Sequence, residues 1–184
     1  MPERAPEAET LLARLNRLRR ETHDGVLRLA DELTDEQLRR RPGPLAPSIG
    51  FHVWHLARWA DHDRALIDGT PQIWESRDLA TAWNLTAGDL GKAKAGTEMS
   101  DDASETLTLP PKDALLEYTK EAFDALDATL GRKSPDDLYA SFGPQGTAKP
   151  LADYLFVFLT HDNRHLGMIE ALRGMLGLKG TASN

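Results

Sequence analysis

The sequence predicts an all-α protein, a four-helix bundle with a long crossover between the second and third helices. Four long segments carry apolar residues at spacings of three and four, the period of one buried helix face. Loops rich in proline and glycine separate these segments, and no segment alternates convincingly like a strand. A polar stretch near the middle of the chain, too long for a tight turn, suits the crossover of such a bundle.

The first long helix is expected to start at Leu11. Its apolar positions form one stripe, made of Leu11, Leu15, Leu18, Val26, Leu29 and Leu33. The sequence TDEQ from Thr34 to Gln37 has the form of a capping box, with a hydroxyl at the cap and Gln three residues later. It predicts a short helix that ends before Pro42, because the proline-rich run that follows restricts the backbone to a loop.

The second and third long helices have clear end signals. The second runs from Ser48, a good N-cap residue, to Gly69. The third follows the pair Pro110–Pro111 and stops at Gly131. Its buried stripe is made of Leu115, Tyr118, Ala122, Leu126 and Leu130.

The fourth long helix follows a second helix start and a loop. Ser134 and Pro135 place a cap residue before proline at the first helical position. The loop that comes next contains Gly143, Pro144 and Gly146. The stripe of the fourth helix is Leu151, Leu155, Phe158, His165, Met168, Leu172 and Leu176.

The two halves of the chain match in layout, which indicates one domain. Each half has a long helix, a short capped helix, a loop and a second long helix. Between the halves, residues 70–110 include the polar run GKAKAGTEMSDDASETLTLP, which has no helical period. We therefore expect residues 1–184 to form a single four-helix domain with a flexible crossover near 70–110.

Composition excludes several classes of function. The net charge of −7 argues against a nucleic-acid binder, which normally has a basic face. The chain has no cysteine, so it forms no disulfide, thiolate zinc site or iron–sulfur cluster. No run approaches the roughly 20 apolar residues that span a bilayer. The charged N-terminus has no apolar signal core, and we expect a cytoplasmic protein.

The spacing of the histidines is the feature of the sequence that indicates a chemical function. Four of the six fall in two helical pairs, His52 with His55 and His161 with His165, and residues at these spacings share a helix face. The second pair lies in line with apolar residues, so we expect it to point toward the bundle interior. A buried imidazole must satisfy its nitrogens, and a metal ion does so for one of them. We expect His55, His161 and His165 to bind one divalent ion, Zn²⁺ or Ni²⁺.

The other histidines have weaker interpretations. His52 is a fourth ligand or a residue at the rim of the site, and we favour the rim. His62 lies about 10.5 Å along the axis from His55, too far to share its metal, and is expected to be exposed. His23 stands alone and receives no functional role. The alternative for the whole set is a metal-free bundle whose inner histidines bond to one another or to the backbone.

Three further residues that could act as functional groups have structural interpretations. Arg58 is interpreted as a member of a surface salt bridge rather than a substrate ligand. Tyr118 is interpreted as a buried side chain with an ordinary hydrogen bond. Asp162 follows a predicted ligand directly, and the sequence assigns it no partner because neighbours on a helix point to different faces.

Two segments resemble a known family. SIGFHVWHLARWADHDRAL and THDNRHLGMIEALRGMLGLKGTA are similar to the DinB/YfiT-like superfamily of bacterial metal-dependent enzymes. The resemblance implies a four-helix bundle that binds a divalent metal through one His of the second helix and a His-x-x-x-His pair of the last. Carried onto this chain, those ligands are His55, His161 and His165, whereas His52 is not part of the usual triad.

The resemblance also implies a class of reaction. Related families use a three-His metal in thiol chemistry, as S-transferases for mycothiol and bacillithiol and as a thiol-dependent maleylpyruvate isomerase. An open metal position can hold a thiol and lower its pKa, whereas water there would serve a hydrolase. We expect a thiol-dependent S-transferase that acts on a small electrophile, takes a low-molecular-weight thiol as partner and forms a homodimer. The alternatives are a hydrolase at the same site and a non-catalytic metal- or ligand-binding bundle.

Overall fold

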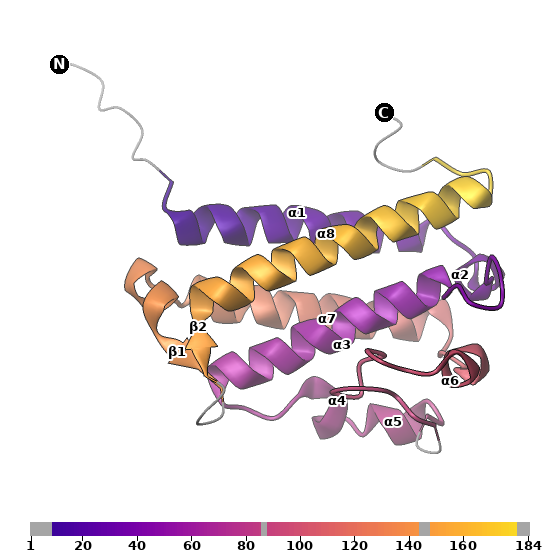
Figure 1. Ribbon diagram of the computed structural model, residues 1–184, viewed down its shortest axis with the longest axis horizontal. Helices are drawn as coiled ribbons and strands as arrows, with labels where there is room; N and C mark the ends of the chain where they lie inside the picture. Colours follow the sequence, from indigo (N-terminus) through magenta and orange to yellow (C-terminus); the bar gives the residue numbers. More distant parts are fainter. Residues whose placement is uncertain (1–8, 86–87, 144–147, 180–184) are drawn as a thin grey trace.

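Four long helices form the body of the protein in the computed structural model, which describes residues 9–85, 88–143 and 148–179. Helices α1 and α3 each pack against both α7 and α8, so the apolar faces of all four meet in one core (Figure 1). This arrangement confirms the predicted all-α fold. The long helices are α1 (Leu11–Asp31), α3 (Ile49–Asp68), α7 (Lys112–Gly131) and α8 (Leu151–Met175).

Local sequence signals fix the helix ends. The Ser48 hydroxyl accepts a hydrogen bond from the Phe51 backbone N–H at 3.2 Å and starts α3. Gly69 ends that helix with a φ of 66°, a conformation that favours glycine. Thr34 and Gln37 form the predicted capping box of the short helix α2 (Asp35–Arg39).

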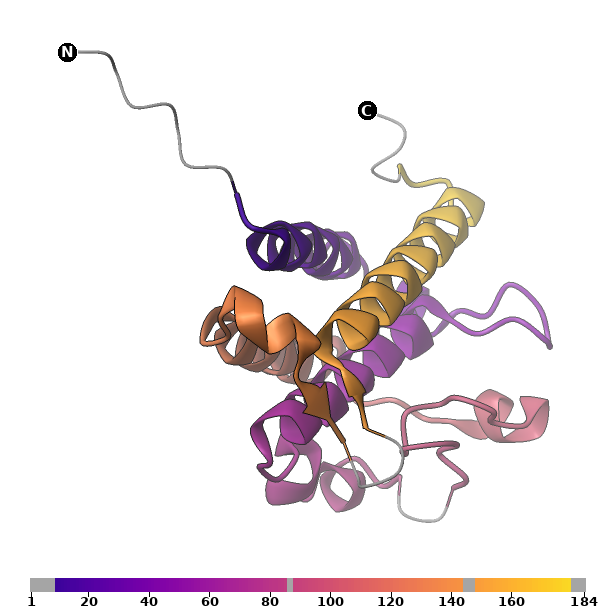
Figure 2. The same cartoon turned by 60° about the vertical axis from the view of Figure 1, so that its left-hand side comes forward.

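The crossover lies beside α3 on one side of the bundle (Figure 2). It contains the short helices α4 (Ile73–Ser76), α5 (Leu79–Ala82) and α6 (Asp101–Thr106). Trp74 and Ala95 are buried in it. A Cβ atom on Gly96, whose φ is 86°, would lie 2.8 Å from Phe51 Cζ. Glycine at this position therefore lets the crossover approach the first turns of α3 closely.

The segment between α7 and α8 differs from the prediction. The structure has a two-residue hairpin of β1 (Ser141–Phe142) and β2 (Lys149–Pro150), with Ser141 opposite Pro150 and Phe142 opposite Lys149. Strands this short show no alternation in sequence, so the prediction of no strand was wrong here. The predicted helix start at Ser134 is the 3-10 helix η1 (Pro135–Tyr139). Positions 144–147 of the predicted loop lie outside the described residues.

The predicted stripe of α1 was partly wrong. Leu11 and Leu18 are 50% and 37% exposed. The buried face instead includes the polar residues Asn16, Arg19 and His23. A search for apolar periodicity cannot find such a face, because polar side chains reach its interior only when distant helices supply partners.

The predicted stripe of α8 was also partly wrong. Its deeply buried positions include Asp162 and Ile169, whereas Met168 is 40% exposed. His161 and His165 are half-buried and line a pocket rather than the bundle core. Among the described helices, none combines the length and apolar character needed to cross a bilayer.

A buried polar network joins α3, α7 and the crossover. Arg58 and Asp61 are both fully buried, so the interpretation of Arg58 as a surface residue was wrong. Arg58 donates to the Tyr118 hydroxyl at 3.0 Å, and that hydroxyl donates to Asp61 at 3.1 Å. The interpretation of Tyr118 as a buried, hydrogen-bonded side chain is confirmed.

Candidate metal centre

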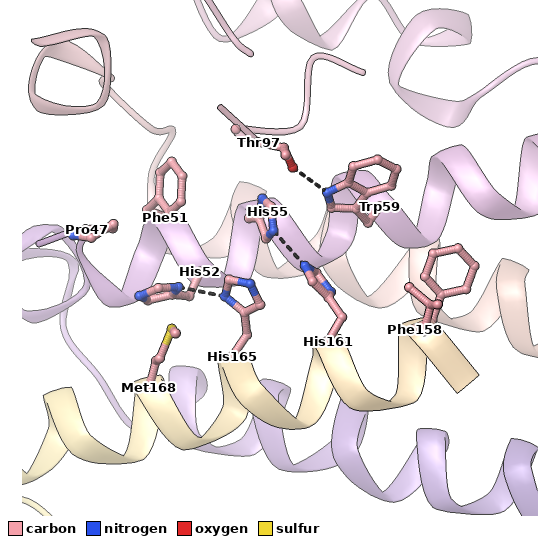
Figure 3. Close-up of a pocket in the computed structure, with 12 residues that line it drawn as sticks. Pro47, Phe51, His52, His55, Trp59, Thr97, Phe158, His161, His165 and Met168 are labelled. Atoms are coloured by element: carbon pink, nitrogen blue, oxygen red, sulfur yellow. Dashed lines mark hydrogen bonds between the residues drawn. The ribbon is translucent and has the colours of Figure 1, made fainter. Parts of the chain in front are cut away.

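The structure brings His55 of α3 together with His161 and His165 of α8 (Figure 3). One ring nitrogen of each lies within 4.8 Å of those of the other two, and the Nε2 atoms of His55 and His161 are 3.0 Å apart. In a tetrahedral zinc site the ligand nitrogens lie about 2.0–2.1 Å from the ion and therefore about 3.3 Å from one another. Small side-chain shifts would bring these three imidazoles to that spacing, so the cluster could hold a divalent ion.

Each of these three histidines has a partner at its Nδ1 atom. For His55 the partner is the carbonyl oxygen of Ala95, at 2.5 Å. For His161 it is the Oδ1 atom of Asp162, at 3.1 Å, and for His165 it is the Nδ1 atom of His52, at 2.9 Å. A partner at Nδ1 orients the ring and leaves Nε2 as the atom that could bind a metal. The donor set, three imidazoles each oriented by a partner at Nδ1, therefore fits a divalent metal ion.

The cluster lies at the wall of a pocket of about 520 Å³ between α3, α8 and the crossover. Apolar and aromatic side chains form most of the other walls, and the Trp59 indole N–H is bonded to the Thr97 hydroxyl at 3.0 Å. None of the described lining residues is Asp, Glu, Lys or Arg. The remaining lining residues are Pro47, Phe51, His52, Gly96, Val157, Phe158 and Met168.

Comparison with known proteins identifies the family. The model of the DinB superfamily matches residues 20–169, most of the chain. The chain belongs to the DinB superfamily. No curated protein matches it.

Solved structures share the fold of this chain at low sequence identity. A conserved protein from Enterococcus faecalis matches with a TM-score of 0.76 and 16% identity, over 90% of this chain and 96% of that one. A DinB-like protein from Bacillus cereus matches with a TM-score of 0.59 and 16% identity, over 94% of this chain and 97% of that one. These similarities concern the fold.

Two further histidines, His52 and His62, lie near the cluster of three. His52 is only 5% exposed and lines the pocket beside the cluster, with its Nδ1 atom 2.9 Å from Nδ1 of His165. His62 is partly exposed, with Nδ1 3.3 Å from Asp63 Oδ1. It lines a neighbouring cavity rather than the pocket that contains the cluster.

Asp162 connects the cluster to a histidine that sequence reasoning left without a role. One of its carboxylate oxygens is paired with His161, and the other lies 3.0 Å from Nε2 of His23 on α1. The His23 ring is buried and stacks on Phe123, with ring centroids 3.6 Å apart. Burial raises the pKa of Asp162, but the hydrogen bonds from His161 and His23 outweigh it, and the pKa falls to about 2. The carboxylate is therefore ionised at neutral pH and suited to orient the His161 ring.

Replacing Asp162 by Asn should weaken metal binding about 10–100-fold, the usual effect of losing the outer partner of a metal-bound histidine. Asparagine has one oxygen and one NH₂ group in place of the two carboxylate oxygens, so it cannot accept the hydrogen bonds from both His161 and His23. Competition with a chromophoric chelator measures the change. Asn163→Asp, at the exposed neighbouring position, is the control and should leave the affinity within about twofold. Equal affinities of Asp162→Asn and wild type would contradict this role.

Two histidines of the cluster, His55 and His165, and the adjacent His52 are held in the neutral state that metal binding requires. Burial lowers the pKa of His52 and His55 to about 4. Burial, helped by the neighbouring histidines, lowers that of His165 to about 2. These imidazoles thus keep a free lone pair at neutral pH.

We expect the metal-free protein to lose stability as the pH falls from about 6.5 to about 4. An unfolded histidine takes up a proton near pKa 6.5, whereas folded His52 and His55 stay neutral down to about 4. In this window the unfolded state binds more protons at these two histidines, so acid favours unfolding, by about 2–3 kcal/mol for each of them. Buried Asp63 offsets part of this loss, because burial raises its pKa to about 7 and the folded state takes up that proton first. Urea unfolding at pH 7, 5.5 and 4.5 measures the loss. His52→Asn should reduce it, and a free energy of unfolding constant over this range would contradict the prediction.

Proposed function

We propose that His55, His161 and His165 bind a divalent metal ion and that the protein is a thiol-dependent S-transferase acting on a small electrophile. The observation that carries the proposal is the position of the histidine cluster in the wall of a mainly apolar pocket. When bound, a divalent ion with three protein ligands supplies an open coordination position, at which a thiol loses its proton more readily.

The pocket residues would supply the rest of the catalysis. Phe51, Trp59 and Phe158 would exclude water and hold an apolar electrophile against the sulfur. The thiol would first lose its proton to solvent. The sulfur would then form a bond to the electrophilic carbon while the bond from that carbon to its leaving group breaks, and the leaving group would depart with the bonding electron pair. The chain's own contribution would thus be to orient the thiol and the electrophile in a pocket that excludes water.

The composition of the pocket favours transfer over hydrolysis. Hydrolysis usually requires a general acid or base for the leaving group, most often a histidine or a carboxyl group. The described lining of the pocket has no carboxyl group, and three of its four histidines are the proposed metal ligands. A thiol with a lowered pKa needs no base in the pocket, because it is already ionised before the electrophile binds.

The test uses the Co²⁺-substituted protein, prepared without a His-tag. Titration with small thiols should produce a sulfur-to-cobalt charge-transfer band, and consumption of an aryl halide should depend on the thiol. Thiol binding without any transfer would support the non-catalytic binding module. Ester hydrolysis with no thiol band would support the hydrolase. His161→Ala should show neither signal.

We also propose that the protein is a cytoplasmic homodimer. The absence of cysteine fits a reducing compartment. Four large apolar side chains of α8 are exposed: Phe156 at 54%, Val157 at 58%, Met168 at 40% and Met175 at 66%. Such side chains are suited to an interface between copies. Sedimentation equilibrium of wild type and Phe156→Glu tests this, since the charge should shift a dimer to monomer.

A further inference from the structure

His52 has one engaged and one available ring nitrogen. Its Nδ1 atom pairs with Nδ1 of His165, at 2.9 Å. No described residue forms a hydrogen bond with its Nε2 atom, although the side chain lines the pocket. Figure 3 shows this second nitrogen on the side of the ring away from His165, where Pro47 and Met168 line the pocket.

Metal binding by His165 would fix the proton positions on both rings. A neutral imidazole that binds a metal through Nε2 carries its proton on Nδ1. His165 would then donate this proton to Nδ1 of His52, which must accept with a lone pair. A neutral His52 that accepts at Nδ1 carries its own proton on Nε2. The ion would thereby set the hydrogen-bonding character of a nitrogen that does not touch it.

We propose that His52, in the metal-loaded protein, donates a hydrogen bond from Nε2 to a neutral oxygen acceptor of the bound ligand. This inference rests on the proposed metal site and deepens it by naming a feature of the substrate. The ligand class is an elongated, mainly apolar molecule with a metal-binding atom at one end and a carbonyl oxygen toward the other.

The absence of cationic side chains from the described pocket lining favours a neutral hydrogen-bond acceptor on the ligand over an anionic one. The described lining has no Lys or Arg, and apolar side chains such as Phe51 and Met168 surround His52. A carboxylate buried there would gain one hydrogen bond and lose its hydration, which costs more than the bond returns. A ketone, ester or amide carbonyl loses little on burial and satisfies the single N–H donor.

The matched test uses hydroxamates, which bind such metals without requiring thiol chemistry. One series of increasing chain length ends in a methyl ketone, and the other ends in an isopropenyl group of the same shape. Competition on the Co²⁺-loaded protein gives a Kd for each compound. At one chain length wild type should favour the ketone about fivefold, the usual effect of one neutral hydrogen bond.

Two substitutions separate the roles of the two nitrogens. His52→Asn keeps an oxygen near the Nδ1 position that can accept from His165, but it removes the donor in the pocket. It should retain cobalt binding and lose the preference for the ketone. His52→Gln places an amide N–H near the Nε2 position and should recover part of the preference. His62→Asn, outside this pocket, should behave as wild type.

A second measurement needs neither variant nor ligand. Long-range ¹H–¹⁵N spectra of the Zn²⁺-loaded protein report which ring nitrogen of each histidine is protonated. We expect protonation at Nε2 for His52 and at Nδ1 for His165. A proton on Nδ1 of His52, or a ketone preference that is absent in wild type or kept in His52→Asn, would overturn this inference and leave the proposed metal site intact. Failure of wild type to bind any metal would overturn both.

Discussion

Replacing His161 by Ala is expected to abolish stoichiometric metal binding. The substitution removes one of three imidazoles whose nitrogens converge within 4.8 Å, and it also removes the partner of His55 Nε2 at 3.0 Å. Two histidines from opposite helices then remain, and the other histidine of the pocket wall, His52, has Nδ1 paired with His165 and its second nitrogen on the side of the ring away from the cluster. Proteins bind such ions tightly only when three or four side chains act as ligands.

Metal analysis by inductively coupled plasma mass spectrometry, on protein purified without a His-tag or added metal, measures this effect. Wild type should contain about one equivalent and His161→Ala less than about a tenth of that, since the missing ligand lowers affinity well beyond the 10–100-fold of an outer partner. His62→Ala is the matched control, because it removes a histidine outside this pocket. Full metal content in His161→Ala would refute the ligand assignment.

Replacing Asp61 by Ala is expected to cause the largest loss of stability, about 3–5 kcal/mol. The carboxylate is fully buried and accepts hydrogen bonds from the backbone N–H groups of Ile73 and Trp74, both at 2.8 Å. It also pairs with Arg64 at 3.0 Å and with Arg58 at 3.4 Å. Its removal leaves the buried Arg58 cation without its carboxylate and detaches the start of the crossover from α3.

Urea denaturation followed by circular dichroism measures the free energy of unfolding. Tyr118→Phe removes one hydroxyl from the same network and should cost only about 1–2 kcal/mol. Asp124→Ala breaks an exposed pair with Lys120 and should change stability by less than about 0.5 kcal/mol. If Asp61→Ala were no more harmful than Asp124→Ala, the network would have no structural role.

Local sequence signals determined the order and the ends of the helices. Ser48 caps α3 through an N–H three residues away, and Gly69 ends it through its own backbone conformation. The capping box at Thr34 works over the same short distance. Such contacts are formed by near neighbours in sequence, so they can be predicted without the fold.

The histidine cluster was predicted in part from its spacing. A separation of four residues places His161 and His165 on one face of a helix, and His55 was expected as the third ligand from its place on the second helix and from the family resemblance. Sequence reasoning missed the groups behind the cluster. His23 lies 139 residues from Asp162, and Ala95 lies 40 residues from His55. The periodicity of residues along one helix cannot predict a contact between segments so far apart in the sequence.

The sequence by itself determined which segments are helical and which histidines share a face. Only the tertiary structure decided which ring nitrogen of each histidine is engaged, which polar side chains of α1 enter the interior and which wall of the pocket His52 occupies. The physical reason is that helix formation depends on neighbours within one or two turns. The partners of a buried polar group, in contrast, come from whichever helix the packing of the whole core places opposite it.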